Sequence, residues 1–115
     1  MKETNGEIRY KDKVLKIVFN LNVMEAIQEE YGSLEAWGKL TDGTEGEINA
    51  KAVIYGITQM INEGIDIDNE ENGTSIKPYT LKQVGRIITE CGLQNITNNM
   101  NDTVIASTES EVKNA

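Results

Sequence analysis

The sequence predicts an α+β fold in which an N-terminal β-hairpin is followed by four or five short helices in one small domain. Three observations lead to this prediction. Apolar residues near the N-terminus alternate with polar ones, as in half-buried strands. Farther along, apolar residues recur every three or four positions, as in amphipathic helices. A length of 115 residues suits a single domain with one modest core.

The hairpin is predicted from alternation in the first twenty residues. We expect strands near Glu7–Tyr10 and Val14–Asn20, joined by a short polar connection. In the second strand, Leu15, Ile17 and Phe19 share one face. Because an isolated hairpin is only marginally stable in water, helices must cover this face.

Two short helices are predicted next from their capping residues. Asn22 is the expected N-cap of the first helix, and Gly32 follows its last turn, where a left-handed residue is favoured. Ser33 is then the expected N-cap of a second helix with Leu34, Trp37 and Leu40 on one side.

The third helix is expected to be the central and most buried one, because its apolar residues cover more than one stripe. The segment Thr44-Glu45-Gly46-Glu47 fits a capping box at its start, and Gly64 is expected to end it. Gly56 lies inside this helix at a cost of about 1 kcal/mol relative to alanine. Either a close helix contact or simple tolerance explains it.

An acidic loop is expected from Ile65 to Lys77. Its likeness to a calcium-binding loop is superficial, because Glu71 stands where the turn needs glycine and Lys77 where a bidentate glutamate is needed. A second capping box, formed by Thr80 and Gln83, then opens the next helix.

After Gly92 the chain carries a helical stripe of four apolar residues, Leu93, Ile96, Met100 and Val104. The residues between them are mostly Asn and Thr, which are weak helix formers. We therefore predict a weak amphipathic helix over 93–106 that needs tertiary or partner contacts to persist. Docking on its own domain, folding against a partner and disorder all remain open for this stripe.

The predicted organisation is one domain over residues 1–106, followed by a flexible polar tail over 107–115. Within the domain the hairpin spans 7–20, the helical part 22–92 and the weak helix 93–106. The candidate protein-binding residues are the apolar stripe and the single tryptophan, which suits either a core anchor or an interface hot spot. They are Trp37, Leu93, Ile96, Met100 and Val104.

Composition excludes several classes of function. Acidic residues outnumber basic ones 19 to 11, which gives a net charge of −8 and argues against binding nucleic acid or anionic membranes. There is no histidine, so Ser-His and Cys-His pairs and the usual zinc ligand sets are missing. We expect no catalytic residue, metal or cofactor. The single cysteine, Cys91, is expected to pack as a small apolar side chain in a cytoplasmic protein.

The order of elements resembles the tail assembly chaperones of long-tailed bacteriophages and prophages of Gram-positive bacteria. The likeness covers roughly residues 7–92 and is carried by four stretches, Val14–Asn20, Glu25–Ser33, Ala50–Ile61 and Pro78–Val84. It implies a small acidic α+β protein without enzymatic activity in the cytoplasm of the bacterial host. Such a protein binds the tape measure protein and keeps it soluble while tail tube subunits, a further expected partner, assemble around it. It leaves before the virion is complete.

Two other classes compete with this interpretation. One is a small acidic inhibitor or immunity-type protein that mimics the charge of DNA, whose binding would depend steeply on salt. Such a mimic would carry spaced rows of carboxylates, whereas the acidic residues here are scattered along the sequence. The other is a structural phage tail component, which would be present in purified virions.

Overall fold

The computed structural model of the chain describes residues 1–113, with side chains described through Thr108. The described residues form two strands and five helices, which confirms the predicted α+β fold with its N-terminal hairpin. The elements are β1 (Thr4–Tyr10), β2 (Lys13–Phe19), α1 (Leu21–Tyr31), α2 (Leu34–Thr41), α3 (Ala50–Asn72), α4 (Leu81–Cys91) and α5 (Leu93–Lys113).

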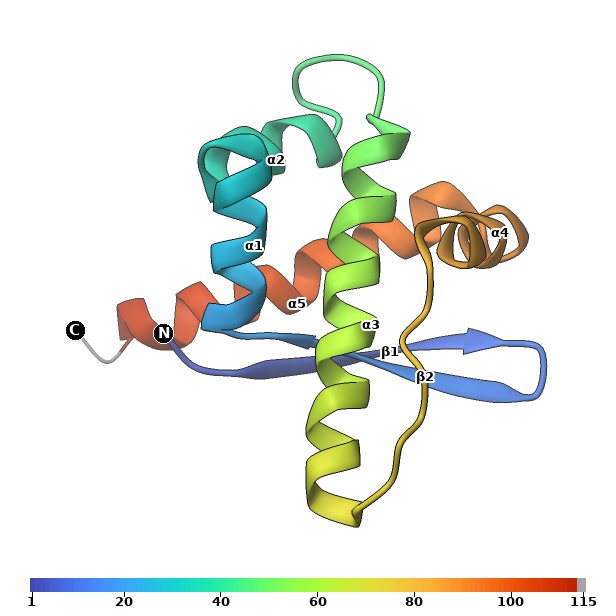
Figure 1. The fold of residues 1–115 in the computed structure, drawn as a ribbon. Coiled ribbons are helices and arrows are strands. Elements are labelled where there is room, and N and C mark those ends of the chain that lie inside the picture. The colour runs from blue at the N-terminus through green and yellow to red at the C-terminus, as the bar shows by residue number, and fades with distance from the viewer. Residues whose placement is uncertain (114–115) are drawn as a thin grey trace.

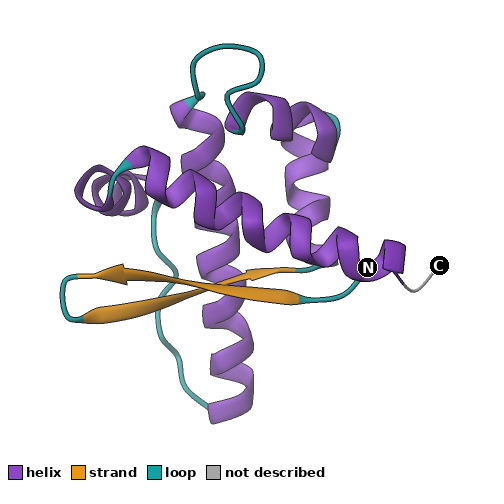
Figure 2. Ribbon diagram, turned by 180° about the vertical axis from the view of Figure 1, so that it is seen from behind, coloured by secondary structure: helices purple, strands orange, loops and turns teal. Residues whose placement is uncertain are grey.

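The hairpin is packed between two long helices. Helix α3 crosses the hairpin and packs against β2 (Figure 1). Helix α5 runs along the hairpin and packs against β1, as the view from behind shows (Figure 2). Helices α1, α2 and α4 complete the domain around α3. The core lies where these elements meet and includes Ile8, Ile17, Phe19, Ile27, Trp37, Ile57, Met60, Ile61, Val84, Ile96 and Met100.

The strands are antiparallel and pair from Thr4 opposite Phe19 to Tyr10 opposite Lys13. The first strand therefore begins three residues before the predicted start at Glu7. Glycine at position 6 makes this possible, because a Cβ there would lie 2.5 Å from the Thr103 hydroxyl of α5. A strand glycine at a close approach of another element is a recognised use of this residue.

Local capping signals identify several helix boundaries correctly. The Ser33 hydroxyl accepts a hydrogen bond from the Ala36 N–H at 3.0 Å and starts α2. The Thr80 and Gln83 side chains form the predicted capping box of α4. Gly92 ends that helix, as predicted.

Two predicted helix starts are wrong. Helix α1 is capped by Asn20 and not by Asn22, because the Asn20 Oδ1 accepts from the first-turn N–H groups. Helix α3 is capped by Asn49, whose Oδ1 accepts from the Ala52 N–H at 2.9 Å. The predicted capping box at Thr44–Glu47 thus lies in the preceding loop.

The prediction that Gly64 ends the third helix is also wrong, since α3 continues to Asn72. Gly64 is buried where α3 crosses β2, and a Cβ there would lie 3.1 Å from the carbonyl oxygen of Lys16. The left-handed residue that ends the helix is Gly73, with φ of 64°. Most of the predicted acidic loop therefore belongs to α3.

The segment 73–80 returns along α3 and is held by two asparagines of that helix. The side-chain amide of Asn69 bonds both the N–H and the C=O of Ile76, and Asn62 bonds both groups of Tyr79. Seven helical residues rise about 10.5 Å and three extended residues span about 10 Å, so the two pairs match in spacing. The ion pair between Lys16 and Asp68, at 2.8 Å, attaches the same half of α3 to β2.

Helix α5 is longer than the predicted 93–106 segment and extends through Lys113. Ser107, the first residue of the predicted tail, is buried within this helix. Residues 114–115 of that tail lie outside the described residues. Bonds to β1 hold the helix in place, since Asn99 donates to the Glu7 carbonyl and Thr4 donates to the Thr103 carbonyl. Of the three alternatives left open for this stripe, the structure shows docking on its own domain.

Candidate functional site

Four of the five predicted binding residues lie in the core. Trp37, Ile96 and Met100 are at most 1% exposed, and Val104 is 8% exposed. The three residues of α5 are buried because this helix turns its stripe toward the hairpin, and Trp37 is buried against α3. These four side chains are closed to direct contact with a partner in this fold. Leu93, at 36% exposure, is the one member of the predicted set that stays at the surface.

Trp37 joins α2 to α3. Its indole N–H donates to the Ala52 carbonyl at 3.0 Å, and its ring lies against Gly56. A Cβ at position 56 would overlap the ring carbon Cζ2 of Trp37. The close-contact explanation of this glycine is therefore confirmed, and the tryptophan is a core anchor.

An apolar groove of about 490 Å³ opens between the first turns of α3 and α4, beside the last turn of α1. A second hollow of about 270 Å³ shares Ile54 and Gly85 with it and continues to Leu93. We call the two together the α3–α4 groove. Its lining residues are Glu30, Ala50, Lys51, Ile54, Tyr55, Leu81, Lys82, Gly85, Ile88, Thr89 and Leu93.

Exposed leucines stand at both ends of the α3–α4 groove. Leu81 is 52% exposed and Leu93 is 36% exposed. Leu81, Gly85 and Ile88 lie on one face of α4, because residues three and four apart are neighbours on a helix. The groove therefore forms a continuous apolar strip along α4.

Gly85 keeps the middle of the groove open. A Cβ there would have only Ile54 Cδ1 nearby, at an ordinary contact distance of 3.6 Å, so internal packing does not require glycine. Glycine inside a helix nevertheless costs about 1 kcal/mol relative to alanine. Any longer side chain at this position would occupy the space beside Ile54.

Two tyrosines support the wall of the groove. The Tyr55 hydroxyl donates to the Ala26 carbonyl at 3.1 Å, and the Tyr31 ring meets the Tyr55 ring edge to face, with centroids 5.7 Å apart. Burial, together with the nearby charge of Glu30, raises the pKa of both tyrosines. Both side chains are therefore neutral at physiological pH, and Tyr55 lines the groove while Tyr31 packs behind it.

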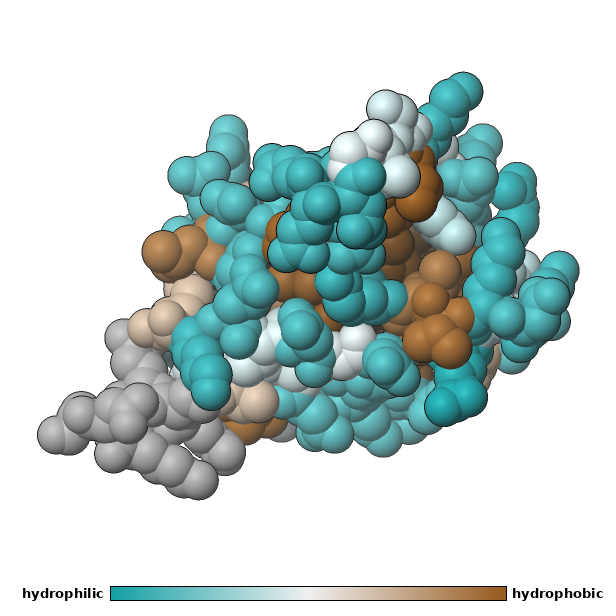
Figure 3. All heavy atoms as spheres, turned by 90° about the horizontal axis from the view of Figure 1, so that it is seen from below, coloured by the Kyte–Doolittle hydropathy of each residue, from teal (hydrophilic) through white to brown (hydrophobic). Residues whose placement is uncertain are grey.

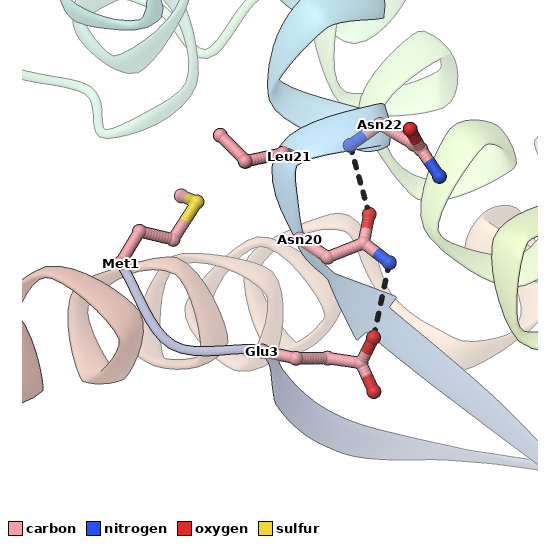
Figure 4. A pocket seen from close by; sticks show the side chains of 5 residues that line it. All are labelled: Met1, Glu3, Asn20, Leu21 and Asn22. Carbon is pink, nitrogen blue, oxygen red and sulfur yellow. Dashed lines mark hydrogen bonds between the residues drawn. The ribbon is translucent and has the colours of Figure 1, made fainter.

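A smaller pocket of about 240 Å³ lies beside the N-terminus and is lined by Met1, Glu3, Asn20, Leu21 and Asn22 (Figure 4). Several polar groups of this pocket form hydrogen bonds within the chain. The Asn20 amide donates to Glu3 at 3.1 Å and to Glu63 at 2.7 Å, while its Oδ1 caps α1. These hydrogen bonds therefore join the residue before β1 and the start of α1 to α3.

Cys91 packs as predicted, partly buried against the core. Its Sγ donates to the Arg9 carbonyl at 3.4 Å. Burial, with the nearby charge of Glu90, raises the pKa of the thiol, which therefore stays protonated near neutral pH. Within residues 1–108, whose side chains are described, no three His, Cys, Asp or Glu residues gather as a metal site would need.

The face seen from below in Figure 3 is mostly hydrophilic, with hydrophobic residues gathered toward its middle. Helix α3 ends on this side of the molecule (Figure 1). Its last turns expose Asp66, Glu70 and Glu71. The acidic end of α3 and the apolar groove at its start are therefore at opposite ends of the same helix.

Comparisons with protein-family models, curated protein sequences and solved structures found no match for this chain. None of the helices in the described part of the chain combines the length and the apolar character that crossing a membrane requires.

Sequence reasoning missed Gly85, Ile54 and Tyr55 as groove residues. They come from two helices, and their proximity depends on how α4 packs against α3. The available signal was the glycine in the middle of an otherwise regular amphipathic helix, a position where glycine is unfavourable without a reason.

Proposed function

We propose that this chain is a phage tail assembly chaperone that binds the tape measure protein and keeps it soluble during assembly of the tail tube. It acts in the cytoplasm of the bacterial host, without a cofactor or catalytic residues. The observation that carries the proposal is the α3–α4 groove, an open apolar strip between Leu81 and Leu93 on a protein with a net charge of −8. The sequence resemblance over residues 7–92 supports the choice of client.

The groove suits the exposed apolar stripe of a long helical client. Each Leu-sized side chain that it buries contributes about 2 kcal/mol. Association costs several kcal/mol in lost translational and rotational freedom, so a short groove binds weakly and reversibly. Weak binding at many sites keeps a long client covered and still allows release when tube subunits arrive. The chain's negative charge keeps the covered client in solution.

Filling the groove tests this function. Gly85→Met is expected to reduce co-purification of the tape measure protein of the same genome by at least about tenfold, because the new side chain occupies the space of one client side chain. The variant is expected to fold at least as stably as the wild type, since methionine is a far better helix former than glycine. The measurement is the amount of soluble tape measure protein retained by the tagged chain after co-expression.

The matched control is Gly38→Met on α2, where no atom lies within 4 Å of an added Cβ. It makes the same substitution in another helix away from the groove. If Gly85→Met and Gly38→Met retain equal amounts of tape measure protein, the groove is not the binding site. A wild-type chain that retains no tape measure protein would reject the proposed function itself.

One observation favours a second candidate, the charge-mimicking inhibitor. The structure places Asp66, Glu70 and Glu71 on the projecting end of α3, where all three are exposed. A mimic that used this end would bind a basic nucleic-acid enzyme and lose affinity steeply between about 0.05 and 0.5 M salt. A groove that buries apolar side chains is much less sensitive to salt, so the same titration separates the two candidates.

A further inference from the structure

The residues that line the α3–α4 groove include more lysines than carboxylates, the reverse of the balance in the whole chain. Acidic residues outnumber basic ones 19 to 11 overall, whereas the groove is lined by two lysines, Lys51 and Lys82, and one carboxylate, Glu30. All three side chains are exposed. The residues that line the groove therefore carry one net positive charge, and the carboxylates of Glu29 and Glu30 both act on Tyr55 in its wall.

The two lysines are not explained by the stability of their own helices. Each lies in the first turn of its helix, Lys51 in α3 and Lys82 in α4, and neither first turn carries an acidic residue. The helix dipole makes a cation unfavourable at that end. Among the residues whose side chains are described, neither lysine has an ion-pair partner within the chain.

We infer that the occupant of the groove is an amphipathic helical segment of the client that carries carboxylates beside its apolar stripe. Its apolar side chains lie over Gly85 between Ile54 and Leu81, and its carboxylates pair with Lys51 and Lys82. This inference rests on the proposed function, because it takes the groove as the client site. An apolar face with charged flanks is the usual form of a helix bound in a groove.

The lysines would set specificity more than affinity. Exposed ion pairs are individually weak, so the two together account for about tenfold in binding. The net charge of the chain opposes an acidic ligand at long range. At about 0.15 M salt the Debye length is about 8 Å, so carboxylates farther than this from the groove are largely screened, and direct contact with Lys51 and Lys82 sets the preference.

The test uses two synthetic peptides of about 18 residues, long enough to form a helix when bound. They share leucines at helical spacing and differ only in having Glu or Lys beside them. By fluorescence anisotropy at about 0.15 M salt, the wild-type chain is expected to bind the Glu peptide about tenfold more tightly than the Lys peptide. The difference should largely vanish at about 1 M salt.

Variants assign the preference to the groove. The double variant Lys51→Glu, Lys82→Glu should prefer the Lys peptide. The double variant Lys51→Gln, Lys82→Gln should bind the two peptides equally. The control is Lys2→Glu with Lys13→Glu, which changes the net charge equally at two exposed lysines that do not line the groove. This control should keep the preference of the wild type.

Several results would overturn the inference. They are equal or tighter binding of the Lys peptide by the wild type, no binding of either peptide, and an unchanged preference in the Lys51→Glu, Lys82→Glu variant. If the Lys51→Glu, Lys82→Glu variant retains the tape measure protein and Gly85→Met loses it, the carboxylates assigned to the client are refuted and the proposed function stands. A preference for the Glu peptide without retention of tape measure protein would refute the function and support the chemistry assigned to the groove.

Discussion

Met100→Asp is expected to remove most of the stability of the domain. Met100 has no exposed surface and lies in the core with the hairpin and α3. An unpaired carboxylate buried there costs several kcal/mol, and about 2 kcal/mol of apolar burial is lost as well. Domains of this size are stable by only about 5–15 kcal/mol, so the change removes most of that margin. Circular dichroism during heating and urea unfolding measures the effect.

Ile105→Asp is the matched control on the same helix. Ile105 is 49% exposed, so a carboxylate there stays in water and should change stability by less than about 0.5 kcal/mol. Similar unfolding midpoints for Met100→Asp and Ile105→Asp would show that α5 is not docked as described. The apolar stripe of that helix would then be free for a partner, as the alternative prediction from the sequence had it.

Gly56→Ala is expected to destabilise the domain by up to about 2 kcal/mol. Alanine is the better helix former by about 1 kcal/mol, but its methyl group would overlap the Trp37 ring. The ring has little room to move, because it is fully buried and hydrogen-bonded to the Ala52 carbonyl. Overpacking of this kind typically costs 1–3 kcal/mol. Urea unfolding measures the loss, and the single tryptophan reports displacement of the ring by its fluorescence.

Gly38→Ala separates the clash from helix propensity. It lies in α2 with open space around an added Cβ, so it should be neutral or stabilising by up to about 1 kcal/mol. If Gly56→Ala were also stabilising, the contact between Trp37 and α3 would be looser than described. Trp37 would then not be a core anchor.

The parts of the fold that could be predicted depend on neighbours in the sequence. Ser33 caps α2, and Thr80 with Gln83 caps α4, through bonds that span three residues. Such bonds leave a pattern that can be recognised without coordinates. Gly64 and Gly73 show the limit. Each directly follows a polar residue, Glu63 or Asn72, and the contact of Gly64 with the Lys16 carbonyl and the positive φ of Gly73 tell them apart.

The candidate site shows the same limit more strongly. The spacing of Ile96, Met100 and Val104 indicated correctly that one helix face is apolar, but spacing does not say whether that face meets the chain itself or a partner. The groove that stays open is built across helices, around Ile54 and Gly85. Its existence depends on tertiary packing, which no local pattern encodes.

Amide chemical shifts show where on the chain a client binds, and we expect them to locate it in the α3–α4 groove. A labelled chain titrated with a helical segment of the tape measure protein should show its largest shifts at Ile54, Tyr55, Gly85 and Leu93. The amide of Leu21, in the pocket beside the N-terminus, should stay unchanged. Shifts centred on that pocket or on the acidic end of α3, with the groove unaffected, would show that the groove is not the client site.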